Sequence, residues 1–262
     1  MTIPSRRTAV AVRGAGPEAA ATAHHPAHHL AGIPPEQRAH PCPGRPVPSA
    51  VRPRPDPVLL LHGTADDRAV LTPLRRTLHR HGWTHLHVLN HAPLGRDVRA
   101  AAVLLARHVE WAVQAHDGRP VALVGHGLGG LIVRYYVQRL GGHALVTAVV
   151  TPATPHGGTT ATPLPGPLPV AGRLRPGGGL PAELALPAPE CGTRFTAVHA
   201  EPDGTVPPRA NARLDHPGLP AVRVAAPEAG PLGLPARPPT VTAVHEALER
   251  WAAGPLTERH AC

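Results

Sequence analysis

The feature that most constrains this 262-residue chain is an apolar run that leads directly through a glycine-rich turn into a helix. The run Val121–Val124 predicts a short buried strand, and Leu128–Leu140 has the spacing of a helix. Gly125-His126-Gly127 stands between them, and Gly129-Gly130 lies in the first helical turn. Glycines at such a turn let a strand and a helix approach each other closely.

Apolar runs and amphipathic stretches alternate from Pro57 onward. The runs are short and almost wholly apolar, which is typical of parallel strands that are covered on both faces. We therefore expect an α/β fold, with a mostly parallel central sheet and helices on both faces. The expected strands cover residues 58–61, 83–90, 121–124, 144–150, 195–199 and 222–225, and the expected helices cover 71–81, 97–116, 128–140 and 240–253.

Two proline-rich segments interrupt this pattern. Residues 1–56 hold eleven Pro, five His and seven Arg, a composition that predicts a disordered tail. Residues 57–262 are then expected to form one domain. Within it, residues 159–190 hold eight Pro and five Gly, which indicates either a lid-like insertion or a poorly ordered loop.

A dinucleotide-binding turn is one alternative for the glycine turn. Gly125, Gly127 and Gly130 fit the spacing G-x-G-x-x-G. However, the acid expected about twenty residues later is missing, because that position falls in an apolar run that ends at Val150. The turn also lies in the middle of the chain, after earlier strands. We therefore expect no nucleotide, and no other cofactor.

The sequence around the turn resembles a known family. The run VALVGHGLGGLIVRYYVQRLGG, followed by VVTPATPHGGT, is similar to the bacterial lipase and esterase family of the α/β-hydrolase superfamily. That family has a Gly-His-Ser-Met/Leu-Gly-Gly elbow and a Thr-Pro-His-Gly-Gly-Thr strand exit. The likeness covers roughly residues 57–253 and is weakest in the Pro/Gly-rich interval. It implies an α/β-hydrolase fold and an ancestry in lipid-ester hydrolysis.

The resemblance assigns roles to individual positions. Gly127 occupies the position of the nucleophilic serine, and Gly125, His126 and Gly129 are the rest of the elbow. The backbone N–H of Leu128 is one expected oxyanion donor. The other is the N–H near Thr64, which follows the family's His-Gly dipeptide, here His62-Gly63. Asp203, in EPDGTVPP, matches the triad acid, and Pro231, in GPLGLP, stands where the catalytic histidine belongs.

Two of the three triad positions are therefore vacated. Glycine has no oxygen to attack a carbonyl, and proline has no nitrogen that accepts a proton. The sequence predicts a lipase-like pseudoenzyme that keeps its cleft and backbone oxyanion hole and binds a lipid or ester-like small molecule. The alternative is an active carboxylic-ester hydrolase that uses an unrecognised nucleophile or an activated water. If the codons of Gly127 and Pro231 were misread, correcting them would restore a triad.

Several side chains are candidates to replace the missing groups. His156 lies in the strand-exit loop and His245 near the start of the last helix, but in a chain with 20 His we expect ordinary structural roles for both. Thr64 has a hydroxyl without an evident base, and Cys191 has no visible histidine partner. His126 flanks the elbow, so its side chain is expected to point away from the cleft.

The remaining composition excludes several classes of function. All 26 basic residues are Arg, giving a net charge of +9, but they are scattered and form no basic helix, so we expect no nucleic-acid partner. Cys42, Cys191 and Cys262 lack the spacing of metal ligands, and a Cys42–Cys191 bridge stays open. We expect a monomer without a bound metal or a membrane span. With no signal peptide visible, we expect a cytoplasmic protein, or a secreted one if the true start lies upstream.

Overall fold

The computed structural model describes residues 54, 56–63, 71–89, 97–160, 174–201, 209–227 and 238–253. All of them belong to one compact unit of the chain, Pro35–Cys262. The tail expected over residues 1–56 lies outside the described residues, apart from Arg54 and Asp56. The boundary between tail and domain therefore stays a prediction.

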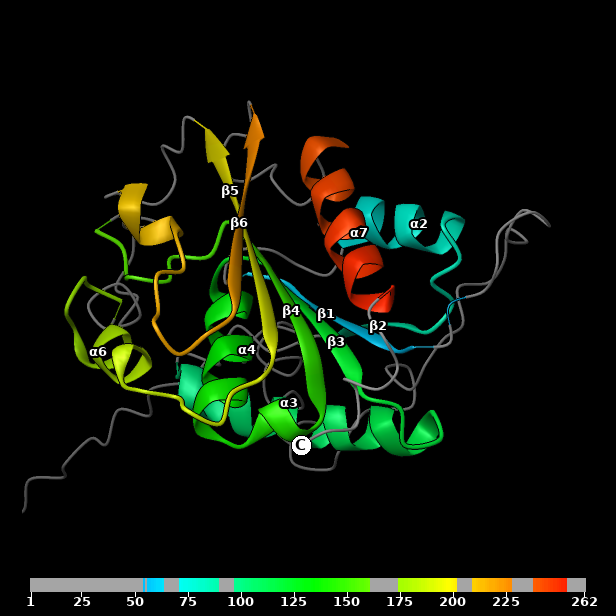
Figure 1. The fold of residues 1–262 in the computed structure, drawn as a ribbon, viewed down its shortest axis with the longest axis horizontal. Helices are drawn as coiled ribbons and strands as arrows, with labels where there is room; N and C mark the ends of the chain where they lie inside the picture. The colour runs from blue at the N-terminus through cyan, green and yellow to red at the C-terminus, as the bar shows by residue number, and fades with distance from the viewer. Residues whose placement is uncertain are drawn as a thin grey trace, which may run out of the picture. The chain divides into compact units, whose positions relative to one another are not determined.

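In the described part of the chain, six strands form a sheet in which every neighbouring pair is parallel. Their order across the sheet is β2-β1-β3-β4-β5-β6 (Figure 1). This arrangement confirms the α/β class and the parallel sheet that the apolar runs predicted. The strands are β1 (Val58–Leu61), β2 (Leu86–Leu89), β3 (Val121–Gly125), β4 (Val146–Pro152), β5 (Arg194–Glu201) and β6 (Ala221–Pro227).

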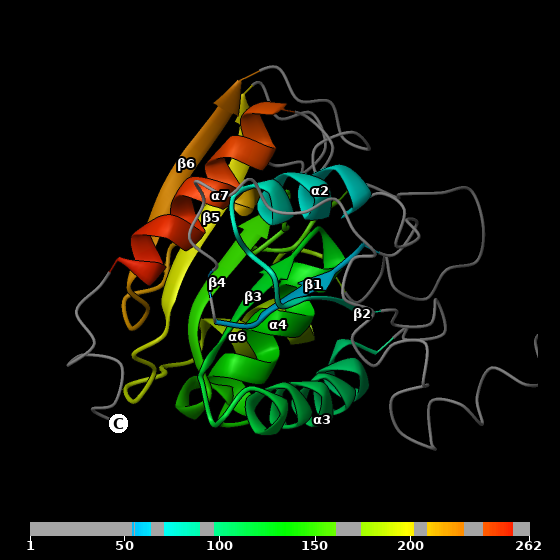
Figure 2. The same ribbon diagram turned by 90° about the vertical axis from the view of Figure 1, so that its right-hand side faces the viewer.

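Helices cover both faces of the sheet, α3 and α4 on one face and α2 and α7 on the other (Figures 1 and 2). Because side chains alternate along a strand, each strand contributes to two cores. Leu59 and Leu123 are buried with α3 and α4, whereas Leu60 and Val124 are buried with α2 and α7. These helices are α2 (Thr72–Arg80), α3 (Val98–Ala115), α4 (Leu128–Arg139) and α7 (Pro238–Ala252).

Two element boundaries differ from the expected ones for identifiable reasons. The helix expected over 97–116 begins at Val98, because the Asp97 side chain caps it by accepting the N–H of Arg99 at 3.0 Å. The strand expected over 83–90 is shorter and spans Leu86–Leu89. Trp83 instead donates its backbone N–H to the last turn of α2 and stacks on Trp251 of α7, with ring centroids 5.9 Å apart.

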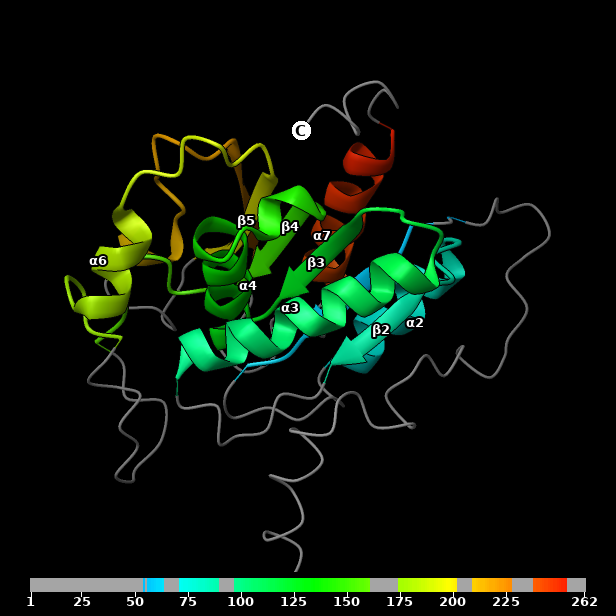
Figure 3. The ribbon, with the colours of Figure 1, turned by 90° about the horizontal axis from the view of Figure 1, so that it is seen from below.

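A short helix, α6 (Gly179–Ala185), lies in the Pro/Gly-rich interval, where the sequence predicted no regular element. Its Leu180 and Leu184 side chains are buried in the core that α4 also lines. Figure 3 shows α6 and α4 on the same side of the sheet. Residues 161–173 of the interval lie outside the described residues, so the lid-like role of the interval stays a prediction.

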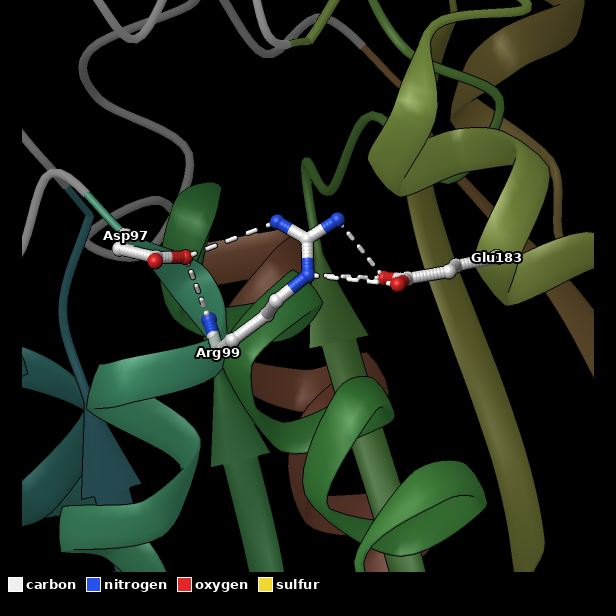
Figure 4. Close-up of polar contacts among 3 residues, drawn as sticks. All are labelled: Asp97, Arg99 and Glu183. Carbon is white, nitrogen blue, oxygen red and sulfur yellow. Dashed lines mark hydrogen bonds and ion pairs between the residues drawn. The ribbon is translucent and has the colours of Figure 1, made fainter.

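An ion pair joins α6 to the start of α3. Arg99 Nη2 lies 2.9 Å from Glu183 Oε2, and Arg99 Nε donates to the same carboxylate oxygen at 3.0 Å (Figure 4). Asp97 lies on the other side of the guanidinium, 3.7 Å from Nη1. These side chains are partly exposed, so the pair fixes the position of α6 more than it adds to stability.

Among the described residues, none of the helices has both the length and the apolar character that a membrane span requires.

Three histidines meet between the edge strand β2 and the end of α3. His87 Nε2 lies 3.1 Å from His116 Nε2, and the rings of His85 and His116 are 4.4 Å apart. Trp111 packs edge-on against His87. Burial and the neighbouring His116 and His85 lower the pKa of His87 to about 4, and burial is also the main cause that lowers the pKa of His116.

These lowered pKa values predict that acid weakens the fold. A histidine with a depressed folded pKa binds fewer protons folded than unfolded, so stability falls as pH falls from 6.5 through about 4. For His87 the loss by pH 4 is roughly 3 kcal/mol. In urea unfolding at pH 7 and pH 4, His87→Phe should lose less stability between the two pH values than the natural protein. His143→Phe, at a half-buried histidine outside this cluster, serves as the control and should behave like the natural protein. Equal losses in all three proteins would contradict the assignment.

Candidate functional site

The order of the strands points to one place on the sheet. After β1 the chain crosses to β2 on one side and then returns to β3 on the other side of β1. In open parallel sheets, ligands bind outside the carboxyl ends of the strands at such a reversal. His62-Gly63 follows β1 there, and His126-Gly127 follows β3. The fold therefore places the glycine turn at the position where this class of sheet binds ligands.

Backbone hydrogen bonds hold the turn between β3 and α4 from two sides. The N–H of His126 donates to the carbonyl oxygen of Leu61, at the end of β1, at 2.9 Å. The N–H of Gly127 donates to the carbonyl oxygen of Pro152, at the end of β4, at 3.0 Å. The turn is thus fixed to both strands that neighbour β3, and its conformation is determined by the sheet.

Three of the glycines at this turn are required by close backbone or side-chain contacts. A Cβ on Gly125 would lie 2.6 Å from the carbonyl oxygen of Gly129. A Cβ on Gly129 would lie 2.7 Å from the carbonyl oxygen of His62. A Cβ on Gly130 would overlap the side chain of Thr154. Any larger residue at these positions would push α4 away from β3, from the end of β1 or from the loop after β4.

Gly127 differs from these three. A Cβ there would contact only the Cα of Gly63, at an ordinary distance of 3.7 Å. Its backbone has φ 55° and ψ −119°, a combination that residues with side chains rarely adopt. The position therefore has room for a side chain, but the backbone is strained for any residue except glycine. That Gly127 is the centre of a nucleophile elbow, in which strain exposes the central side chain above the sheet, stays a prediction of the sequence.

The turn also presents a backbone donor. The N–H groups of Gly129 and Gly130 donate to the carbonyl oxygens of His126 and Gly127, at 2.9 and 3.1 Å. The N–H of Leu128, the first residue of α4, has no acceptor among the described residues, as expected for the first N–H groups of a helix. Leu128 stands directly after Gly127, and the role of its N–H as an oxyanion donor stays a prediction.

Three of the predicted site residues lie outside the described residues. Thr64 follows Gly63, Asp203 follows the end of β5, and Pro231 lies between β6 and α7. The structure brings the elbow residues Gly125, His126, Gly127, Leu128 and Gly129 together, while the positions of the expected acid, of the vacated histidine and of the second oxyanion donor stay predictions.

A buried hydroxyl–imidazole pair lies near the end of β4. Thr151 Oγ1 and His156 Nε2 are 2.9 Å apart, which is the distance of a nucleophile and its base. However, both side chains are almost fully buried, at 1% and 4% exposure. Burial, aided by the nearby Arg134 cation, holds the pKa of His156 well below its usual range. The Thr151 hydroxyl is therefore closed to a substrate, and the pair does not replace the missing nucleophile and base.

The other replacement candidates do not form a catalytic group either. The His245 ring lies 4.1 Å from His81 at the end of α2, and His245 pairs with Glu249, which also binds Arg54 ahead of β1. These contacts place His245 towards the amino end of β1, opposite the elbow. Cys191 is a buried free thiol whose pKa is raised by burial, which disfavours the thiolate.

One strained residue beside the elbow was not predicted. Ala153, which follows β4, has φ 50°, and its N–H donates to the carbonyl oxygen of Val198 at 2.9 Å. Alanine gives no sequence signal for this conformation, because the neighbouring strands impose it.

Within the described ranges, no three His, Cys, Asp or Glu side chains are arranged to hold a metal ion.

Sequence comparison finds a partial family match. The profile of the palmitoyl protein thioesterase family matches residues 57–176, a stretch that includes β1 to β4 and the whole elbow. A comparison with curated proteins finds no match.

Several solved structures resemble this chain. The mature form of Bacillus licheniformis lipase BlEst2 has a TM-score of 0.59 at 16% identity, covering 78% of this chain and 96% of its own. Est1E from Butyrivibrio proteoclasticus has a TM-score of 0.56 at 14% identity, covering 76% of this chain and 89% of its own. A lipase-esterase related protein from Clostridium acetobutylicum ATCC 824 has a TM-score of 0.53 at 13% identity, covering 77% of this chain and 97% of its own. At such low identities the likeness establishes the fold, and the chain has the α/β-hydrolase fold that the sequence predicted.

The elbow geometry predicts an order of stabilities for glycine substitutions. Gly127→Ser should lower the free energy of unfolding by about 1–3 kcal/mol, because only backbone strain opposes it. Gly125→Ser should cost about 3 kcal/mol or more, because its Cβ would collide with the backbone of α4. Gly118→Ser, where φ is also positive and no atom lies within 4 Å, is the matched control and should cost no more than Gly127→Ser. Urea unfolding of the three variants measures this order, and a Gly127→Ser loss as large as that of Gly125→Ser would show that the position is closed.

Proposed function

We propose that this chain is a lipase/esterase-like homologue that has lost ester hydrolysis and keeps a cleft for an acyl ester, thioester or carboxylate. Gly127 carries the proposal. It combines the position, the strained backbone and the free side-chain space of a catalytic nucleophile with a residue that has no side chain. Close contacts exclude a side chain at the three other glycines of the turn, whereas the space beside Gly127 would accommodate one.

The second departure removes the base. Pro231 stands at the position of the catalytic histidine in the family resemblance, and a proline nitrogen in the backbone accepts no proton. Asp203 is then a retained acid without the imidazole that it would orient. In serine hydrolases, removing the nucleophile or the histidine abolishes most of a roughly 10⁶-fold acceleration, and about 10³–10⁴ over water is left from the oxyanion hole and binding.

Backbone donors survive such side-chain losses. The N–H of Leu128 needs no particular side chain, and we assign the second donor to the backbone near Thr64. A carbonyl or carboxylate oxygen is the ligand that two converging N–H groups favour. The comparisons suggest an acyl group beside that oxygen, since the similar structures include a lipase and the matching family is a protein thioesterase family.

Restoring the two groups tests the proposal. The natural protein and a Gly127→Ser, Pro231→His double variant are assayed with short- and medium-chain p-nitrophenyl esters. We expect the natural protein to match the buffer background and the double variant to exceed it by about 10²-fold or more, a fraction of the triad's full effect. The single variants should stay near background, because nucleophile and base act as a unit.

A matched control separates the elbow from general effects of glycine replacement. Gly118→Ser combined with Pro231→His adds a hydroxyl at another positive φ, remote from the turn, and should be inactive. If the natural protein turns over the esters and a serine-directed fluorophosphonate does not block it, an unrecognised nucleophile is at work and the proposal fails. An inactive but folded double variant would contradict the retained cleft.

A further inference from the structure

A cavity lies beside α4, α6 and the short helix η3 (Arg209–Ala212), and its lining does not include residues 125–129 of the glycine turn. Its volume is about 380 Å³, within the range of small-molecule sites. Arg134 and His156 form part of its wall, and Asn211 and Arg213 come from the segment that η3 begins. Most of the other lining residues are small, among them Ala182 and Ala185.

Arg134 is a buried cation without a described counter-charge. Its side chain is 3% exposed, and all its hydrogen-bond partners are neutral. Nε donates to Gln138 Oε1 at 2.6 Å, Nη1 to the carbonyl oxygen of His156 at 3.1 Å, and Nη2 to that of Leu184 at 2.8 Å. No carboxylate of the described residues forms an ion pair with it.

The positive charge of Arg134 is not neutralised by these bonds, and some of its N–H groups remain without an acceptor. A guanidinium has five N–H groups, of which the three bonds above use three and leave two. Burial, and the charge of the nearby Arg139, lower the pKa of Arg134 to about 10, so the side chain is still a cation near neutral pH. A buried charge is costly unless an opposite charge pairs with it, and the cavity wall is where such a charge can reach this one.

Two more polar groups of the wall are buried without a described protein partner. His156 is 4% exposed, and its Nδ1 makes no hydrogen bond there, while Nε2 is engaged with Thr151. Asn211 Nδ2 is also buried and unbonded. Buried polar atoms in native proteins are nearly always bonded to protein, water or ligand. Together with Arg134 they surround one cavity with unused hydrogen-bonding capacity.

The remaining charges of the cavity do not neutralise Arg134. Asp215 lines the cavity, but it is exposed and pairs with Arg223 at 3.1 Å. Arg213 is exposed and adds a second cation to the lining. The lining therefore holds two arginines and one carboxylate that is already paired.

We propose that this cavity binds a small organic carboxylate, with Arg134 and Asn211 holding its oxygens and Arg213 at the entrance. A monoanion balances the one buried guanidinium, whereas a phosphate dianion would bury an excess charge. The small residues Ala182 and Ala185 leave room for a short apolar substituent rather than a second polar group. The site is separate from the elbow, so this proposal does not depend on the lost nucleophile.

Calorimetric titration of the full chain tests this site. Acetate, propionate and butyrate are titrated at constant ionic strength, with chloride and phosphate as comparison anions. We expect saturable binding of the carboxylates, and Asn211→Ala should weaken it by about tenfold through the loss of a bond to a charged group. Arg213→Ala should weaken it severalfold, since its charge is exposed. Gly157→Ala should also impair binding, because its Cβ would lie 2.7 Å from Asn211 Oδ1.

A control variant, expected to bind as the natural protein does, distinguishes loss of the site from a general effect of substitution. Arg250→Ala, at an exposed arginine of α7, should bind as the natural protein does. Arg134 is not substituted, because its bonds hold the loop at His156 and the end of α6 in place. No saturable carboxylate binding, tighter binding of phosphate, or full affinity in folded Asn211→Ala and Arg213→Ala variants would each overturn the proposal.

Discussion

The contact between the start of α4 and the ends of β1 and β3 is the constraint on which the rest of this structure depends. Gly125 leaves room for the carbonyl of Gly129 in α4, and Gly129 leaves room for the carbonyls of Leu61 and His62 at the end of β1. Hydrogen bonds to Leu61 and Pro152 then hold the turn in place. These bonds come from the main chain, so the conformation of the turn is set by the neighbouring strands.

Glycine at position 127 is therefore compatible with the fold. A residue with a side chain at Gly127 would carry backbone strain of about 1–3 kcal/mol, and glycine removes it. The backbone N–H of Leu128 is unaffected by that change. Under the proposed function, catalysis and architecture are separable: the proposed donor is a main-chain group, whereas a nucleophile and a base would be two side chains.

Much of the fold followed from the sequence, because parallel strands buried on both faces are short apolar runs and the intervening helices are amphipathic. The close approach of β3 and α4 was also predictable, since the glycines between them indicate close contacts. The helix α6 was not, because its two core residues, Leu180 and Leu184, lie among prolines and glycines and its position depends on Glu183 pairing with Arg99. A contact between residues so distant in sequence leaves no local pattern.

The cavity beside α4 and α6 could not be predicted from the sequence for a related reason. An arginine within a helix predicts an exposed side chain, and the burial of Arg134 follows only from the packing of α4 against α6 and the loop at His156. The assignments of Thr64, Asp203 and Pro231 still depend on resemblance to a family, since these residues lie outside the described ranges.

The most direct test of the central claim is a stopped-flow measurement of p-nitrophenol release on mixing the natural protein with a p-nitrophenyl ester, followed by intact-mass spectrometry of the quenched protein. An elbow without a nucleophile forms no acyl-enzyme, so the account predicts no burst of p-nitrophenol and an unchanged protein mass. A burst stoichiometric with the protein, accompanied by the mass of one acyl group, would contradict it.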